Sequence, residues 1–93
     1  MPVGLLTIDL HLPGCRSLKG KRRIVRRVID RIRNRFNVSV AEVDHQDLWQ
    51  RTTVAVAVVS NDYKFSDSVL TRVVKQVEGD ANVQVVEYNL TML

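Results

Sequence analysis

Basic side chains crowd into one stretch of the chain, residues 16–35, and these side chains are well suited to binding phosphate. The stretch holds ten of the fourteen lysines and arginines and a single acid, Asp30, so it carries a charge of +9 against −5 for the rest. Arginine dominates, and its planar guanidinium group can donate two parallel hydrogen bonds to one phosphate. The pattern predicts contact with nucleic acid or another anion. The residues expected to make this contact are Lys19, Lys21, Arg22, Arg23, Arg26, Arg27 and Arg33.

The same stretch is predicted to be a helix. Its apolar residues recur at three- and four-residue steps, from Val25 through Ile32 to Phe36, so they form one buried stripe. Ser17 is predicted to cap the start, and Asn37 to end the helix in the left-handed conformation. Cations in the first turn oppose the partial positive charge of a helix start, so an external anion would relieve that repulsion. The alternative is a basic face that is only solvated, or that meets acids of a neighbouring subunit.

A second group of polar side chains lies in the segment 44–51. A histidine and two carboxylates within four residues are donors that a divalent metal accepts, but their spacing matches no established metal loop. We therefore predict a polar hairpin loop and expect no metal or other cofactor. The tryptophan could stack on a ligand, but a large aromatic residue at a strand start more often covers the core, which is our prediction. The candidate interaction residues are Asp44, His45, Asp47, Trp49 and Arg51.

Acid–base chemistry has a weaker basis in the sequence. Asp9 and His11 share one face of a predicted strand and could join Asp44 or Glu87 as a catalytic group. A polar edge on that face is the preferred interpretation. Cys15 lacks an obvious base to activate it and is predicted to be unreactive.

The pattern of apolar residues and turn residues predicts how the chain arranges these groups. Its order of strands and helices predicts an α+β, ferredoxin-like split βαβ sandwich, with strands one and three central and both helices on one face of a four-stranded antiparallel sheet. The other face would stay open, with Val3 and Leu5 on it, so we expect a homodimer or larger homo-oligomer. The expected elements are a strand at 3–12, a helix at 17–36, a bulged strand at 37–45, a strand at 49–60, a helix ending at Gly79 and a strand at 82–90.

Length and composition set limits on the class of protein. A chain of 93 residues is predicted to form a single domain, residues 1–93. It contains no apolar run long enough to span a bilayer and no signal-peptide pattern, so a cytoplasmic location is expected. The single cysteine permits no internal disulfide. RNA-binding domains with this strand order stack bases on aromatic residues of the central strands, which this sequence lacks, so contact would run along the basic helix.

Two segments, SLKGKRR at 17–23 and RNRFNVSVAEVDHQDLWQR at 33–51, resemble the YlxP-like family of small bacterial proteins, a domain of unknown function. The SND of residues 60–62 extends the resemblance. It implies a ferredoxin-like fold and gene neighbours among translation and ribosome-maturation factors, but no established activity. This chain departs from the family in having Gly20 where an acid is usual, and Cys15. The family pattern falls on Ser17, Leu18, Lys19, Lys21, Arg22, Arg33, Asn34, Phe36, Asn37, Glu42, Asp44, Gln46, Asp47, Trp49 and Arg51.

These observations predict a non-enzymatic domain associated with RNA or the ribosome through the basic face of its first helix. The alternatives are a protein-interaction module that docks an acidic partner, and a small enzyme that uses the polar sheet face. The enzyme would use Asp9, His11, Asp44 and His45.

Overall fold

Six regular elements follow one another in the order βαββαβ in the computed structural model, which describes residues 2–93. The strands form one sheet in the order β2-β3-β1-β4, and all neighbouring strands are antiparallel. The predicted ferredoxin-like fold, with strands one and three central, is confirmed. The elements are β1 (Val3–His11), α1 (Leu18–Arg35), β2 (Ser39–Asp44), β3 (Arg51–Val59), α2 (Tyr63–Glu78) and β4 (Gln84–Met92).

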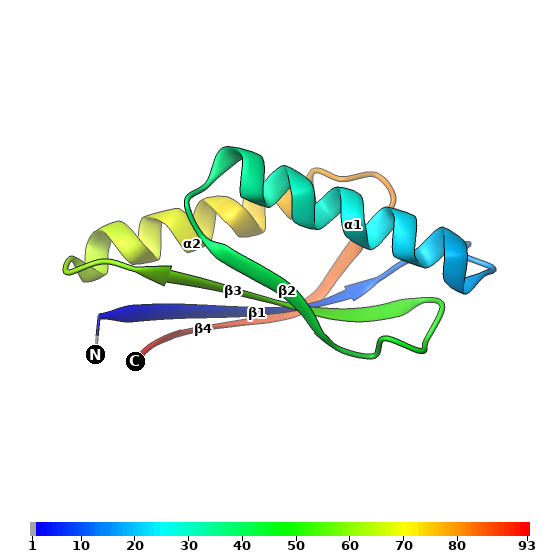
Figure 1. Cartoon of the computed structure of the whole chain (residues 1–93), viewed down its shortest axis with the longest axis horizontal. Coiled ribbons are helices and arrows are strands. Elements are labelled where there is room, and N and C mark those ends of the chain that lie inside the picture. The colour runs from blue at the N-terminus through cyan, green and yellow to red at the C-terminus, as the bar shows by residue number, and fades with distance from the viewer. Residues whose placement is uncertain (1) are drawn as a thin grey trace.

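The core lies between the sheet and the two helices, which cover the same face of the sheet (Figure 1). Successive strand residues point to opposite faces, so alternate residues of β1 enter the core, among them Leu6 and Ile8. They pair with Val56 and Val54 of β3, and all four are at most 1% exposed. From α1, the core receives the predicted apolar stripe, including the fully buried Ile32.

The predicted caps Ser17 and Gly79 are confirmed, most strand ends differ from the prediction by one or two residues, and the predicted end of α1 is wrong. Ser17 caps α1, its hydroxyl accepting a hydrogen bond from the backbone N–H of Gly20 at 3.0 Å, and α2 ends at Gly79. The prediction of a left-handed Asn37 is wrong. Among residues 2–93, His45 is the one non-glycine residue with a positive φ, and Phe36, which follows α1 and is buried, is extended with φ of −125°. The predicted bulge in β2 is present, but it lies between Glu42 and Asp44.

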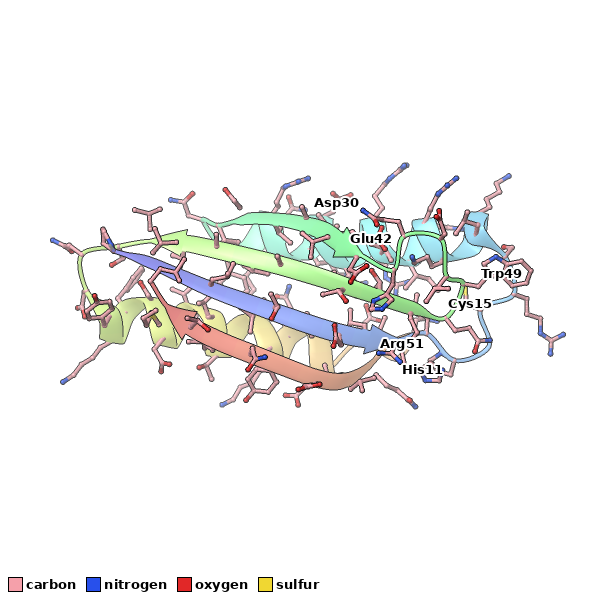
Figure 2. The ribbon with its side chains drawn as sticks, turned by 90° about the horizontal axis from the view of Figure 1, so that it is seen from below. His11, Cys15, Asp30, Glu42, Trp49 and Arg51 are labelled. Atoms are coloured by element: carbon pink, nitrogen blue, oxygen red, sulfur yellow. The ribbon has the colours of Figure 1, made fainter. Side chains whose placement is uncertain are left out.

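The face of the sheet opposite the helices carries no helix, as predicted (Figure 2). Its apolar part lies around Leu5 of β1, where a shallow hollow is lined by small side chains that include Ala41, Ala55 and Ala57. Toward the other end of the same strands the residues of this face become polar, beginning in β1 with Thr7 and Asp9.

Self-association through this open face stays a prediction. We expect sedimentation equilibrium to detect a dimer or larger assembly at micromolar concentration, because an apolar sheet face is a favourable surface to bury. Leu5→Asp, which would place a charge in the centre of the apolar part, is expected to shift the protein to monomer. If the unsubstituted protein sedimented only as a monomer, the prediction would be wrong.

Within residues 2–93, neither helix combines the length and the apolar character needed to cross a membrane.

Candidate functional site

Lys21 is the residue around which the candidate site is built, and its place differs from the prediction. Its side chain is 0% exposed, and the ammonium nitrogen lies 2.8 Å from a carboxylate oxygen of Glu42. The same nitrogen donates to the backbone carbonyl oxygens of His45 at 2.6 Å and Gln46 at 3.1 Å. The prediction that Lys21 contacts an external anion is therefore wrong, because its charge and its donors are used inside the domain.

The ammonium group of Lys21 is fully satisfied in this position. It has three N–H donors, which match the Glu42 carboxylate and the two carbonyl oxygens. The Glu42 oxygen also accepts a hydrogen bond of 2.5 Å from the hydroxyl of Thr52, which is itself 0% exposed. Burial of a charge is tolerable when it is paired and hydrogen-bonded in this way.

These contacts order the loop between β2 and β3, residues 45–50. His45 adopts a left-handed backbone, with φ of 61°, and its carbonyl oxygen also accepts a hydrogen bond from the N–H of Leu48. At the other end of the loop, the carbonyl of Gln50 accepts from Leu12 at 2.9 Å, and the Gln50 side chain donates to the carbonyl of Cys15 at 3.2 Å. The β2–β3 loop is thus fixed beside the start of α1, and Figure 1 shows both at the same end of the sheet.

Two carboxylates lie beside arginines of the C-terminal half of α1. Asp80, in the loop before β4, lies 2.8 Å from Arg27 and 3.6 Å from Arg31. Arg33 lies 4.0 Å from Asp30 and donates a hydrogen bond to the carbonyl of Val40 in β2. Arg27 and Arg33, both predicted to contact an anion, therefore already have partners within the domain.

The N-terminal half of the helix is different. Lys19, Arg22, Arg23 and Arg26 are exposed and together line one surface hollow. Among residues 2–93, no carboxylate lies within the 4.0 Å of an ion pair from any of these four side chains. We call these four residues the basic patch. Four of the seven predicted anion-binding residues are thus exposed and form no ion pair among residues 2–93.

A second hollow connects the basic patch to the edge of the sheet. It runs between α1 and β2, and Arg22 and Arg26 line this hollow as well as the first. Apolar atoms of Val25 and Ile29 contribute to its lining, which also includes two acids, Asp30 of α1 and Glu42 of β2. The patch therefore borders a groove.

Trp49 lies on the surface, which makes its predicted role as a cover for the core wrong. Its side chain is 53% exposed, and that of the neighbouring Leu48 is 48% exposed. The reason is that β3 begins only at Arg51, which leaves Trp49 on the loop. Leu12 and Cys15, both buried, close the core at this end. Figure 2 shows Trp49 at the extremity of the molecule, beyond Cys15.

The other loop residues take part in polar contacts at the open sheet face. The carboxylate of Asp44 accepts a hydrogen bond from the N–H of His45 at 2.7 Å. The Nδ1 atom of His45 lies 3.0 Å from the hydroxyl of Thr53, which donates to Asp9 at 2.6 Å. Because that hydroxyl has one proton, His45 must carry its proton on Nδ1 to complete this chain. Asp47 is exposed on the same loop.

These hydrogen bonds connect two of the residues considered for acid–base chemistry, Asp9 and His45, but they do not include His11. Thr53, which connects Asp9 to His45, was missed from the sequence because its position opposite Asp9 depends on the strand register. His11 instead contacts the side chain of Gln84 at 3.2 Å and pairs with Arg51 across the sheet (Figure 2). In the described part of the chain, no cluster of three His, Cys, Asp or Glu side chains is arranged to hold a metal ion.

Comparison with known proteins agrees with the predicted resemblance. A protein of Bacillus subtilis (strain 168) described as "Uncharacterized protein YlxP" is 37% identical over 82 residues, which cover 88% of this chain and 89% of that protein. Among solved structures, the de novo designed protein Foldit4 matches with a TM-score of 0.62 at 17% identity over 98% of both chains, a likeness of fold alone. A REP-associated tyrosine transposase bound to a REP hairpin has a TM-score of 0.44, too low to support any argument.

The family model described as "Protein of unknown function (DUF503)" matches residues 3–90. The match spans every regular element of the fold, from β1 into β4, and includes the basic helix and the loop with Trp49. The chain belongs to the DUF503 family.

Proposed function

We propose that this domain binds RNA and that the basic patch holds the phosphates of the RNA backbone. The observation that carries the proposal is that only some of the cations on α1 have an acid of the domain beside them. Asp80 and Asp30 lie beside arginines of the C-terminal half, whereas the four cations of the basic patch have no acid of residues 2–93 within ion-pair distance. Crowded cations repel one another, and an external phosphate removes that repulsion.

The chemistry of the patch favours phosphate over other anions. Three of its four residues are arginines, and a guanidinium group forms paired hydrogen bonds with a phosphate. Contacts of this kind go to the backbone of a nucleic acid, so they position the ligand and read little of its sequence. They also displace counterions, and the affinity therefore falls steeply as salt is added.

The residues of the central strands are a further reason to place the RNA on α1 and not on the open sheet face. The central strands β1 and β3 contain no aromatic residue, so the open sheet face cannot stack bases as the RNA-binding domains with this strand order do. The family resemblance implies gene neighbours among translation factors, and ribosomal RNA is for that reason the RNA to test first.

The test is a double charge reversal, Arg22→Glu plus Arg26→Glu. Binding of a labelled ribosomal RNA fragment is measured by fluorescence anisotropy between 50 mM and 200 mM salt. We expect the unsubstituted domain to bind with a steep salt dependence and the variant to bind at least tenfold more weakly at the lower salt, because each phosphate contact contributes about 0.7–0.9 to the slope of log K against log salt. The matched control is Lys64→Glu plus Lys75→Glu, which changes the net charge equally on the exposed side of α2 and should retain most of the affinity.

Two outcomes would contradict the proposal. If the domain does not bind RNA, or if the affinity does not change with salt, the proposed phosphate contacts are wrong. An equal loss in both double variants shows that net charge, and not the basic patch, controls binding. Capture of an acidic protein by the domain after ribonuclease treatment, with loss of that capture in Arg22→Glu plus Arg26→Glu, would assign the patch to a protein partner instead.

A further inference from the structure

Trp49 is the one tryptophan of the chain, and it lies on the surface at the end of the molecule. It is 53% exposed on a loop, with the half-exposed Leu48 beside it. An exposed indole ring presents a large flat apolar surface to which another flat group can pack.

The loop that carries Trp49 is fixed in advance of any binding. Its first residues are held by the two hydrogen bonds from the buried ammonium of Lys21. Its last residue, Gln50, is bonded through both backbone and side chain to the segment that leads into α1. A contact surface that is already ordered loses little conformational entropy when a ligand binds.

The same interactions fix Trp49 relative to the basic patch. Lys21, the residue that holds the loop, lies between Lys19 and Arg22 of the patch in the first turns of α1. The patch and the tryptophan therefore belong to one rigid part of the molecule, at the end of the sheet where the start of α1 meets the β2–β3 loop (Figures 1 and 2). This end of the molecule would thus offer cations and a flat aromatic ring a short way apart.

We propose that Trp49 stacks against an unpaired RNA base while the basic patch binds phosphates of the same strand. This inference rests on the proposed RNA-binding function and narrows the ligand to RNA with a single-stranded loop, bulge or end. Bases in a duplex are stacked on one another and cannot lie on a side chain, whereas unpaired bases can. Cations that follow the backbone, combined with an aromatic residue for the base, are the usual means of binding single strands.

The test uses the fluorescence of Trp49, excited at a wavelength that the two tyrosines do not absorb, so that the signal reports on this position alone. An unstructured single-stranded RNA and a blunt duplex of the same length are each titrated into the full chain at 50 mM salt. We expect the single strand to quench the fluorescence and the duplex to leave it nearly unchanged. In parallel anisotropy titrations with labelled RNA, Trp49→Ala should bind the single strand roughly tenfold more weakly, with unchanged affinity for the duplex. Trp49→Phe, which keeps an aromatic face, should retain most of the single-strand affinity.

Failure of this inference can be separated from failure of the proposed function. If Trp49→Ala binds both RNAs as the unsubstituted chain does, while Arg22→Glu plus Arg26→Glu still weakens binding, stacking is wrong and the phosphate contacts stand. If neither RNA binds, both proposals are overturned. Because Trp49 lies on the surface, a thermal unfolding curve is expected to show that Trp49→Ala is folded, and a loss of binding then reports on the contact itself.

Discussion

Replacing Lys21 with methionine is expected to lower the free energy of unfolding by about 3–5 kcal/mol, as removal of one partner from a buried ion pair does. Methionine has nearly the volume of lysine, so the effect is electrostatic and not a matter of packing. The substitution leaves the carboxylate of Glu42, which is 19% exposed, without its cation. It also leaves the carbonyl oxygens of His45 and Gln46 without the ammonium donor. Urea unfolding followed by circular dichroism measures the change.

Two further variants identify the cause of the Lys21 effect. Lys19→Met removes a cation of the same helix turn that is exposed, and it should leave the unfolding midpoint unchanged within error. Lys21→Met combined with Glu42→Gln removes both charges, and it should be more stable than Lys21→Met alone because no unpaired charge remains. If Lys21→Met unfolded at the same urea concentration as the unsubstituted domain, the ammonium contacts would have no net effect on stability.

Replacing Asp80 with alanine is expected to lower the free energy of unfolding by about 2–3 kcal/mol. The Asp80 side chain is only 7% exposed, and it accepts two hydrogen bonds from Arg27, at 2.8 and 3.0 Å. A third hydrogen bond comes from the backbone N–H of Asn82 at 2.9 Å. Because Arg27 is 35% exposed, water can partly replace its lost partner, and we expect a smaller effect than for Lys21.

The control for Asp80 is Asp30→Ala, measured by the same urea unfolding. Asp30 is 56% exposed and lies 4.0 Å from Arg33, so its loss should not shift the midpoint measurably. A comparable loss of stability in the two variants would show that general charge repulsion along α1, and not the specific contacts of Asp80, is responsible.

The fold could be predicted from the sequence because its elements repeat simple patterns. In β1, strict alternation from Leu6 to Leu10 defines one buried face. The apolar run from Val54 to Val58 suits a strand in the middle of the sheet. Strand boundaries were less accurate, because polar residues such as Gln50 are compatible with either a strand end or a loop. Because β3 begins at Arg51 and not at the predicted residue 49, Trp49 lies on the surface and not at the edge of the core.

The candidate site could be predicted only in part. For Lys21, the charge of the side chain indicated exposure, whereas its position in the helix indicated burial. Lys21 lies four residues before Val25, on the buried stripe of α1, and this spacing was a signal that the helix pattern contained. Its charge and its basic neighbours outweighed the spacing and led to the prediction of an exposed cation. The contact between Arg27 and Asp80 had no such signal, since 53 positions separate the two residues along the chain. The basic patch was predicted correctly as exposed because it lies on the polar side of the same helix.

The ion pair between Lys21 and Glu42 has a consequence for how the sequence of this domain can change in evolution. A variant that loses Lys21 leaves the carboxylate of Glu42 unpaired, and one that loses Glu42 leaves a buried cation unpaired, so either substitution alone is expected to lower stability. Replacement of both residues together leaves neither charge unpaired. Positions 21 and 42 are therefore expected to change together.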